Sequence, residues 1–152
     1  MTKRMIVATL SLAGIFVALY LLLYKLGIVG NLACSIGSCE TVNLSKWATF
    51  LGAPVAAWGV GFYVVMFVLA LASLQDRYIE SVGMSKVLAL VSGSGFAFSA
   101  WLTYLELFVI HAVCQWCVVS AIIVTLIFVF ALLDLRERSS FAGLDSSTLQ
   151  NL

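Results

Sequence analysis

The stretch VCQWCVVSAIIVTLIFVFALL, residues 113–133, contains no charged side chain and is built mainly from branched apolar residues. A helix needs about 20 mainly apolar residues to cross the hydrocarbon core of a bilayer. Three other stretches, residues 5–24, 53–74 and 87–110, meet the same requirement, and Glu106 is the only charged residue within the four. The sequence therefore predicts four membrane-spanning helices.

The overall composition agrees with this prediction. The chain has 152 residues, of which 63% are hydrophobic and 10% charged, with a mean hydropathy of +1.13. A soluble domain has about half apolar and a quarter charged residues, and a net charge of +1 gives no sign of nucleic-acid binding. We expect an all-α integral membrane protein, with a four-transmembrane-helix bundle over residues 1–138 and a loosely ordered cytoplasmic tail over 139–152.

The basic residues predict the orientation, because cytoplasmic loops carry an excess of lysine and arginine. A cytoplasmic N-terminus leaves only Lys25 and Lys46 outside and places six basic residues inside: Lys3, Arg4, Arg77, Lys86, Arg136 and Arg138. Both termini are then cytoplasmic, and residues 25–52 form a long extracytoplasmic loop. Within this loop, NLSKWATFLG predicts a short interfacial helix with Asn43 as its N-cap.

Four cysteines occur as two pairs, CSIGSC (Cys34 and Cys39) and CQWC (Cys114 and Cys117), and the predicted topology places both pairs outside. Residues three apart on a helix share a face, so Cys114 and Cys117 can approach each other. The unpaired N–H groups and the dipole of a first helical turn favour a thiolate, which is typical of reactive C-x-x-C pairs. His111, one turn upstream, is a candidate proton carrier.

Three interpretations of the cysteines remain open at this point. A zinc site needs four deprotonated ligands, which the two cysteine pairs and His111 could supply. Purely structural disulfides would suit the oxidising side of a membrane, for instance in a small four-helix transporter. However, a C-x-x-C bridge closes almost no chain and so stabilises little. Because such a disulfide would add little stability, a redox function is the favoured interpretation.

The segment CSIGSCETVNLSKWATFLGAPVAAWGVGFY, residues 34–63, followed by the late CQWC, resembles prokaryotic members of the vitamin K epoxide reductase family. The resemblance covers essentially the whole chain. It implies a membrane thiol oxidoreductase, functionally parallel to DsbB, in the prokaryotic cytoplasmic membrane. Such an enzyme reoxidises a separate thioredoxin-fold, DsbA-like partner and passes the electrons to a membrane quinone, supporting disulfide formation in exported proteins. No metal is expected.

The resemblance also implies roles for individual residues. The partner attacks the Cys34–Cys39 disulfide at Cys34, the freed Cys39 attacks Cys114, and Cys117 delivers electrons to the quinone. Cys117 lies deeper along the last span than Cys114, which agrees with the membrane location of a quinone ring. The expected quinone-binding residues are Cys117, Ser45, Trp47, Phe50, Trp58 and Phe62.

Two further features concern the quinone site. Animal members of the family carry a polar asparagine and tyrosine where this chain has Val55 and Ala121, so vitamin K epoxide reduction is not expected here. Glu106 lies about one helical turn from the outer end of its span. An acidic residue within a span is costly and suggests function by default. Glu106 and His111 are therefore candidates for a proton relay to the reduced quinone.

Overall fold

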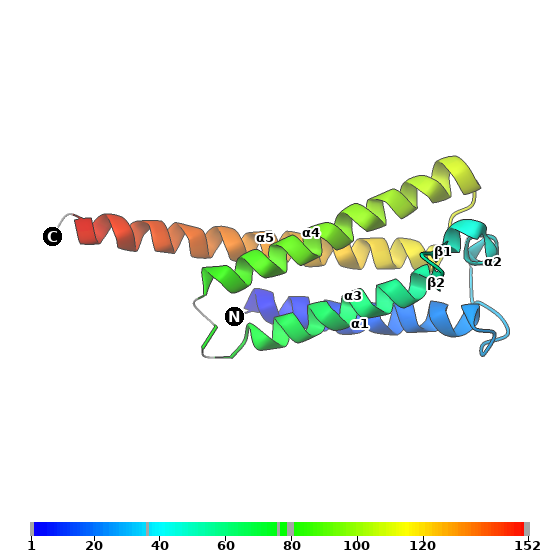
Figure 1. Ribbon diagram of the computed structural model, residues 1–152, viewed down its shortest axis with the longest axis horizontal. Helices are drawn as coiled ribbons and strands as arrows, with labels where there is room; N and C mark the ends of the chain where they lie inside the picture. The colour runs from blue at the N-terminus through cyan, green and yellow to red at the C-terminus, as the bar shows by residue number, and fades with distance from the viewer. Residues whose placement is uncertain (1, 36, 76, 79–80, 151–152) are drawn as a thin grey trace.

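The computed structural model describes residues 2–35, 37–75, 77–78 and 81–150. Four long helices lie side by side, and both chain termini are at the same end of the bundle (Figure 1). They are α1 (Thr2–Lys25), α3 (Val55–Ala72), α4 (Val82–Leu105), which continues into the π-helical turn η2 (Glu106–Ile110), and α5 (Gln115–Gln150). All four are long and apolar enough to cross a membrane. The predicted all-α four-helix membrane bundle is confirmed.

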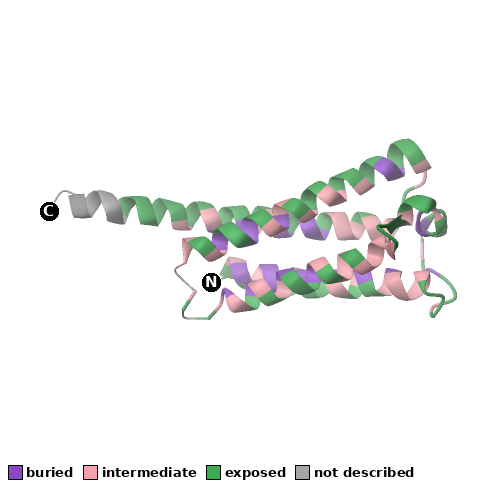
Figure 2. Cartoon of the chain, viewed as in Figure 1, coloured by how far each residue is buried: buried purple, intermediate pink, exposed green. Residues whose placement is uncertain are grey.

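The apolar core runs between the helices and contains Tyr63, Met66, Leu88 and Ile127, which are at most 3% exposed. Figure 2 shows buried positions within the bundle, while residues 139–144 of α5, beyond the other helices, are exposed. Helix α1 packs closely on α3 and α5, and α5 packs on α4, whereas α3 and α4 contact each other much less. Figure 1 shows α4 diverging toward the end opposite the termini.

The segment between α1 and α3 covers that end of the bundle (Figure 1). It contains α2 (Cys39–Leu44), the short 3₁₀ turn η1 (Lys46–Ala48) and a two-stranded hairpin of β1 (Thr49–Phe50) and β2 (Ala53–Pro54). Leu51 and Gly52 form the hairpin turn, both with positive φ, 52° and 82°. Two positive φ angles give a turn whose twist matches antiparallel strands. This hairpin positions Phe50 beside α3 and α4.

Two local predictions differ from the structure. The short helix ends at Leu44 instead of starting at Asn43, because Ser45 is extended (φ −64°, ψ 155°) and its hydroxyl donates to the Val42 carbonyl. Burial of Cys39 and Val42 against the bundle places the helix earlier in the chain. The serine-rich tail, expected to be loosely ordered, is helical as far as Gln150; residues 151–152 lie outside the described part.

A buried polar cluster closes the bundle at the end that carries the termini. Arg4 of α1 is 2% exposed, and its Nε lies 3.1 Å from Oδ2 of Asp134 on α5. Ser85 of α4 accepts from Arg4 Nη2 at 2.9 Å and donates to Asp134 at 2.6 Å. Arg4 also donates to the main-chain carbonyls of Ser73 and Tyr78. The cluster thus links α1, α4, α5 and the end of α3.

Candidate active site

The four cysteines meet at the end of the bundle opposite the termini. Cys34 and Cys39, the first residue of α2, form a disulfide. Cys114 and Cys117 are thiols. Cys39 and Cys114 are at most 1% exposed and share one apolar cluster, against which Cys34 and Cys117 pack. The two pairs, separated by about half of the chain, are therefore brought into one site.

Main-chain contacts dock the disulfide segment on the start of α5. Gly37 and Cys114 form an isolated antiparallel bridge, and the Ser38 amide donates to the Val113 carbonyl at 2.9 Å. Trp116 adds a second attachment, since its indole Nε1 donates to the Ala33 carbonyl at 2.9 Å. Because these bonds flank both pairs, they fix the disulfide next to the C-x-x-C motif. Thiol–disulfide exchange needs such proximity.

Gly37 is required for this docking. Its φ is +92°, and a Cβ at this position would lie 2.2 Å from the Val113 carbonyl oxygen. An L side chain in the left-handed region costs about 1–3 kcal/mol, and the clash adds to that. Gly37→Ala is therefore expected to slow disulfide exchange between the two cysteine pairs by about tenfold or more. Acid quenching and mass spectrometry of the disulfide-linked peptides would measure this rate.

Gly27 supplies a matched control for this substitution. It lies in the same loop with φ +75°, but nothing lies within 4 Å of its added Cβ. Gly27→Ala therefore introduces a comparable backbone strain without a clash. Equal exchange rates in the Gly37→Ala and Gly27→Ala proteins would show that the bridge to Cys114 does not control exchange.

Asn43 connects the two pairs through its side chain. It is 7% exposed, and its amide nitrogen donates to the Cys39 carbonyl at 3.0 Å and approaches the Cys114 sulfur at 3.9 Å. Lys25, at the end of α1, donates in turn to the Asn43 carbonyl. Sequence reasoning treated Asn43 only as a helix cap. The polar residue four positions after Cys39, on the same face of α2, was the signal for this contact.

Cys114 lies directly before α5 instead of within its first turn, and its carbonyl accepts the helical hydrogen bond of Val118 at 3.0 Å. A hydrogen bond with the Cys117 thiol lowers the pKa of Cys114 to about 7, and the backbone N–H groups of Trp116 and Cys117 act in the same direction. Burial and the Glu106 charge oppose this shift. This lowered pKa favours the departure of Cys114 as a thiolate, which makes it a better leaving group.

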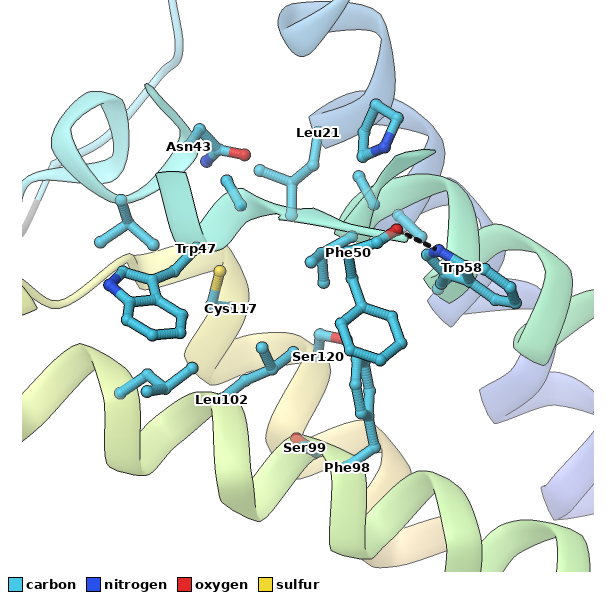
Figure 3. A pocket seen from close by; sticks show the side chains of 18 of the residues that line it. Leu21, Asn43, Trp47, Phe50, Trp58, Phe98, Ser99, Leu102, Cys117 and Ser120 are labelled. Carbon is cyan, nitrogen blue, oxygen red and sulfur yellow. Dashed lines mark hydrogen bonds between the residues drawn. The ribbon is translucent and has the colours of Figure 1, made fainter. Parts of the chain in front are cut away.

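A cavity of about 360 Å³ lies beside Cys117, between α1, α3, α4, α5 and the segment from α2 to β2. Figure 3 shows side chains of Cys117, Trp47 and Phe50 around it. All six residues expected to bind a quinone line this cavity: Cys117, Ser45, Trp47, Phe50, Trp58 and Phe62. Cys114 does not line it. Of the four clustered cysteines, Cys117 is therefore the one exposed to the cavity.

Aromatic rings form the wall of the cavity at the hairpin. Phe50 contacts the rings of Trp58, Phe98 and Trp101 in edge-to-face geometry, with centroids 5.8–6.3 Å apart. The Trp58 Nε1 donates to the Phe50 carbonyl at 3.1 Å (Figure 3). These contacts hold β1 against α3 and α4. A second hollow of about 370 Å³ adjoins this wall and shares Trp47, Phe50 and Leu102 with the cavity.

Gly95 of α4 makes room for Phe62 of α3, since a Cβ on Gly95 would lie 2.3 Å from the Phe62 ring. The neighbouring Tyr63 is 2% exposed and hydrogen-bonds the Ser120 hydroxyl at 2.8 Å. Its hydroxyl also donates to the Ser120 carbonyl at 3.0 Å, so the phenylalanine–tyrosine pair is held by close packing and two polar contacts. Val55 also lines the cavity and leaves it apolar at that point.

The two candidate proton carriers have different environments. Glu106 is 6% exposed, lines the cavity and accepts a hydrogen bond from the Cys114 amide at 3.2 Å. Its carboxylate also interacts with the Cys117 thiol. His111 is exposed, has a left-handed backbone (φ 54°) and does not line the cavity. The structure brings Glu106, but not His111, to the thiols.

Within the described residues, no group of three or more histidine, cysteine, aspartate or glutamate side chains is arranged to hold a metal ion. The fold instead brings a disulfide, two thiols, a carboxylate and an apolar cavity next to one another in space. Comparison with known families agrees with a redox site: the model of the vitamin K epoxide reductase family matches residues 5–132, a range that includes all four cysteines.

Proposed function

The chain belongs to the vitamin K epoxide reductase family, and from this premise we propose that it reoxidises a separate thioredoxin-fold protein and passes the electrons to a membrane quinone. Membership of the family implies a membrane oxidoreductase. The observation that carries the proposal is the packing of both cysteine pairs into one cluster, from which Cys117 faces an apolar cavity.

The first half of the proposed reaction is thiol–disulfide exchange. A thiolate of the partner attacks Cys34, forms a mixed disulfide and releases the Cys39 thiolate. Cys39 then attacks Cys114 of an oxidised Cys114–Cys117 pair, and Cys117 leaves as a thiolate. The second thiol of the partner displaces Cys34, which attacks Cys39 and releases Cys114. The Cys34–Cys39 disulfide is restored, the partner is oxidised and the Cys114–Cys117 pair is reduced.

The structure corresponds to the state at the end of this exchange, because Cys34–Cys39 is a disulfide while Cys114 and Cys117 are thiols. The lowered pKa of Cys114 favours its departure as a thiolate. The docking bonds of Gly37 and Ser38 hold the disulfide at the start of α5. These contacts support direct exchange between the pairs without a large movement of the segment.

The cavity suits a quinone in size and chemistry. Ligand sites of a few hundred Å³, mostly apolar with few polar groups, bind small organic molecules of this size. Aromatic rings of Trp47, Phe50 and Phe62 would hold the head group, and the adjoining apolar hollow has room for part of an isoprenoid tail. A bound quinone supplies the two-electron acceptor. Cys117 is the thiol positioned toward it.

The proposal includes a location in the membrane. The excess of basic residues at the end that carries the termini supports a cytoplasmic position for that end. The cysteines would then lie at the extracytoplasmic side of a prokaryotic cytoplasmic membrane, where exported proteins acquire disulfides. This arrangement is parallel to that of DsbB.

The test mixes the purified protein, a reduced DsbA-like partner and ubiquinone or menaquinone, while quinone absorbance and free partner thiols are followed. We expect one quinone to be reduced for every two partner thiols lost. Cys34→Ser should abolish the reaction with the partner, whereas a small dithiol should still reduce quinone through Cys114 and Cys117. Partner-driven turnover that survives Cys34→Ser, or a wild-type protein that does not reduce quinone, would contradict the proposal.

A further inference from the structure

Glu106 lies where a buried acid is difficult to explain by packing alone. It is 6% exposed and belongs to a helix long and apolar enough to cross a membrane. Burying a carboxylate in such a segment is costly, and acids found there commonly take part in ion or proton pathways. Within the described part of the chain, the only other charged side chain that lines the cavity is Lys25.

The backbone around Glu106 is also unusual. Helix α4 changes at this residue into the π-helical turn η2, Glu106–Ile110. Such turns are rare and occur frequently at functional sites. Here the turn is closed by the amides of His111 and Ala112, both of which donate to the Glu106 carbonyl. The side chain is thereby directed toward the start of α5.

The Glu106 carboxylate interacts with both members of the C-x-x-C motif. One oxygen accepts the Cys114 amide at 3.2 Å, and the side chain interacts with the Cys117 thiol. Glu106 and Cys117 also line the same cavity, together with Tyr63, whose hydroxyl is paired with Ser120. Among the described residues, Glu106 is thus the only carboxylate that lines the cavity with Cys117.

We propose that Glu106 is a catalytic acid–base residue, which accepts the proton of the Cys117 thiol and returns it to an oxygen of the acceptor in the cavity. Oxidation of the Cys114 and Cys117 thiols to a disulfide releases two electrons and two protons, which together convert a quinone to a quinol. Glu106 carries one of these protons, and the second originates from Cys114. The inference rests on the proposed function.

The main alternative is that Glu106 only positions Cys114 through the hydrogen bond to its amide. Glu106→Gln separates the two roles, because glutamine keeps a carbonyl oxygen that accepts the amide but takes up no proton. We expect Glu106→Gln to keep disulfide exchange between the two pairs and to lower quinone reduction by about 100-fold or more, as for loss of a general acid–base group. Glu106→Ala should impair both steps.

A second measurement uses the protein without quinone. Reduction of the Cys114–Cys117 disulfide creates a Cys117 thiol beside Glu106, which should change the hydrogen bonding of the Glu106 carboxylate and give a carboxyl band in the infrared difference spectrum. The band should be absent in Glu106→Gln. Glu137→Gln is the matched control, because Glu137 is exposed and pairs with Lys3 at the other end of the bundle. It should leave both the band and turnover unchanged.

The outcomes distinguish this inference from the proposed function. If wild-type protein reduces quinone and Glu106→Gln does so equally fast, or if the wild-type spectrum contains no carboxyl band, the role of Glu106 is overturned while the proposed function stands. If wild-type protein does not reduce quinone at all, the proposed function fails first. Equal loss of exchange and quinone reduction in Glu106→Gln would assign Glu106 to positioning.

Discussion

Cys117→Ser should reduce quinone turnover to the background of the assay, because a serine hydroxyl cannot form a disulfide and so cannot supply electrons to a quinone. Cys117 is the cysteine that lines the cavity, and Cys114 lies behind it, fully buried. No other described cysteine can therefore replace it at the cavity. Quinone absorbance, followed with either the partner or a small dithiol as reductant, measures the loss.

The same substitution should trap an intermediate. Without Cys117, the Cys114 thiolate can attack the neighbouring Cys39 and displace Cys34. The resulting Cys39–Cys114 disulfide can then be resolved only by the return of Cys34, because no Cys117 thiol is present to attack Cys114. Mass spectrometry of unreduced peptides should detect this bond in Cys117→Ser. Val118→Ser, which places the same side chain one residue later and outside the cavity lining, is the control and should turn over. Turnover in Cys117→Ser would contradict the proposed electron path.

Arg4→Met is expected to destabilise the bundle by about 3 kcal/mol or more, as for removal of one partner from a buried ion pair. The substitution leaves the Asp134 carboxylate buried with one cation fewer. It also removes the donor to the Ser73 and Tyr78 carbonyls. Methionine fills most of the volume of the arginine side chain. The loss of stability therefore reflects lost polar contacts more than a new cavity. Unfolding in detergent, by heat or by added denaturing detergent, measures it.

Lys3 provides the matched control for Arg4. It is the preceding residue on α1 and forms an ion pair with Glu137, but this pair is at the surface. Exposed pairs contribute less than about 1 kcal/mol. Lys3→Met should therefore have a small effect. If both variants unfold alike, the cluster of Arg4, Ser85 and Asp134 does not hold the helices together.

Features that depend on neighbouring residues along the chain could be predicted from the sequence. Each span is a continuous apolar run, and the cost of exposing main-chain polar groups to lipid forces such a run into a helix. The C-x-x-C motif is equally local: its spacing, at the start of a span, predicts that its two cysteines lie on one face and can approach each other. The six residues named as quinone-binding candidates all line the cavity, but they came from the family resemblance and not from spacing.

Contacts between distant segments could not be predicted in this way. The bridge from Gly37 to Cys114, the amide of Asn43 and the buried pair of Arg4 and Asp134 join residues that lie far apart in the sequence. The neighbouring sequence does not show that Arg4 is buried and Lys3 is not, or that Glu106 is buried and His111 is not. Packing of the folded helices makes that choice, because a buried charge is stable only where the fold supplies its partners.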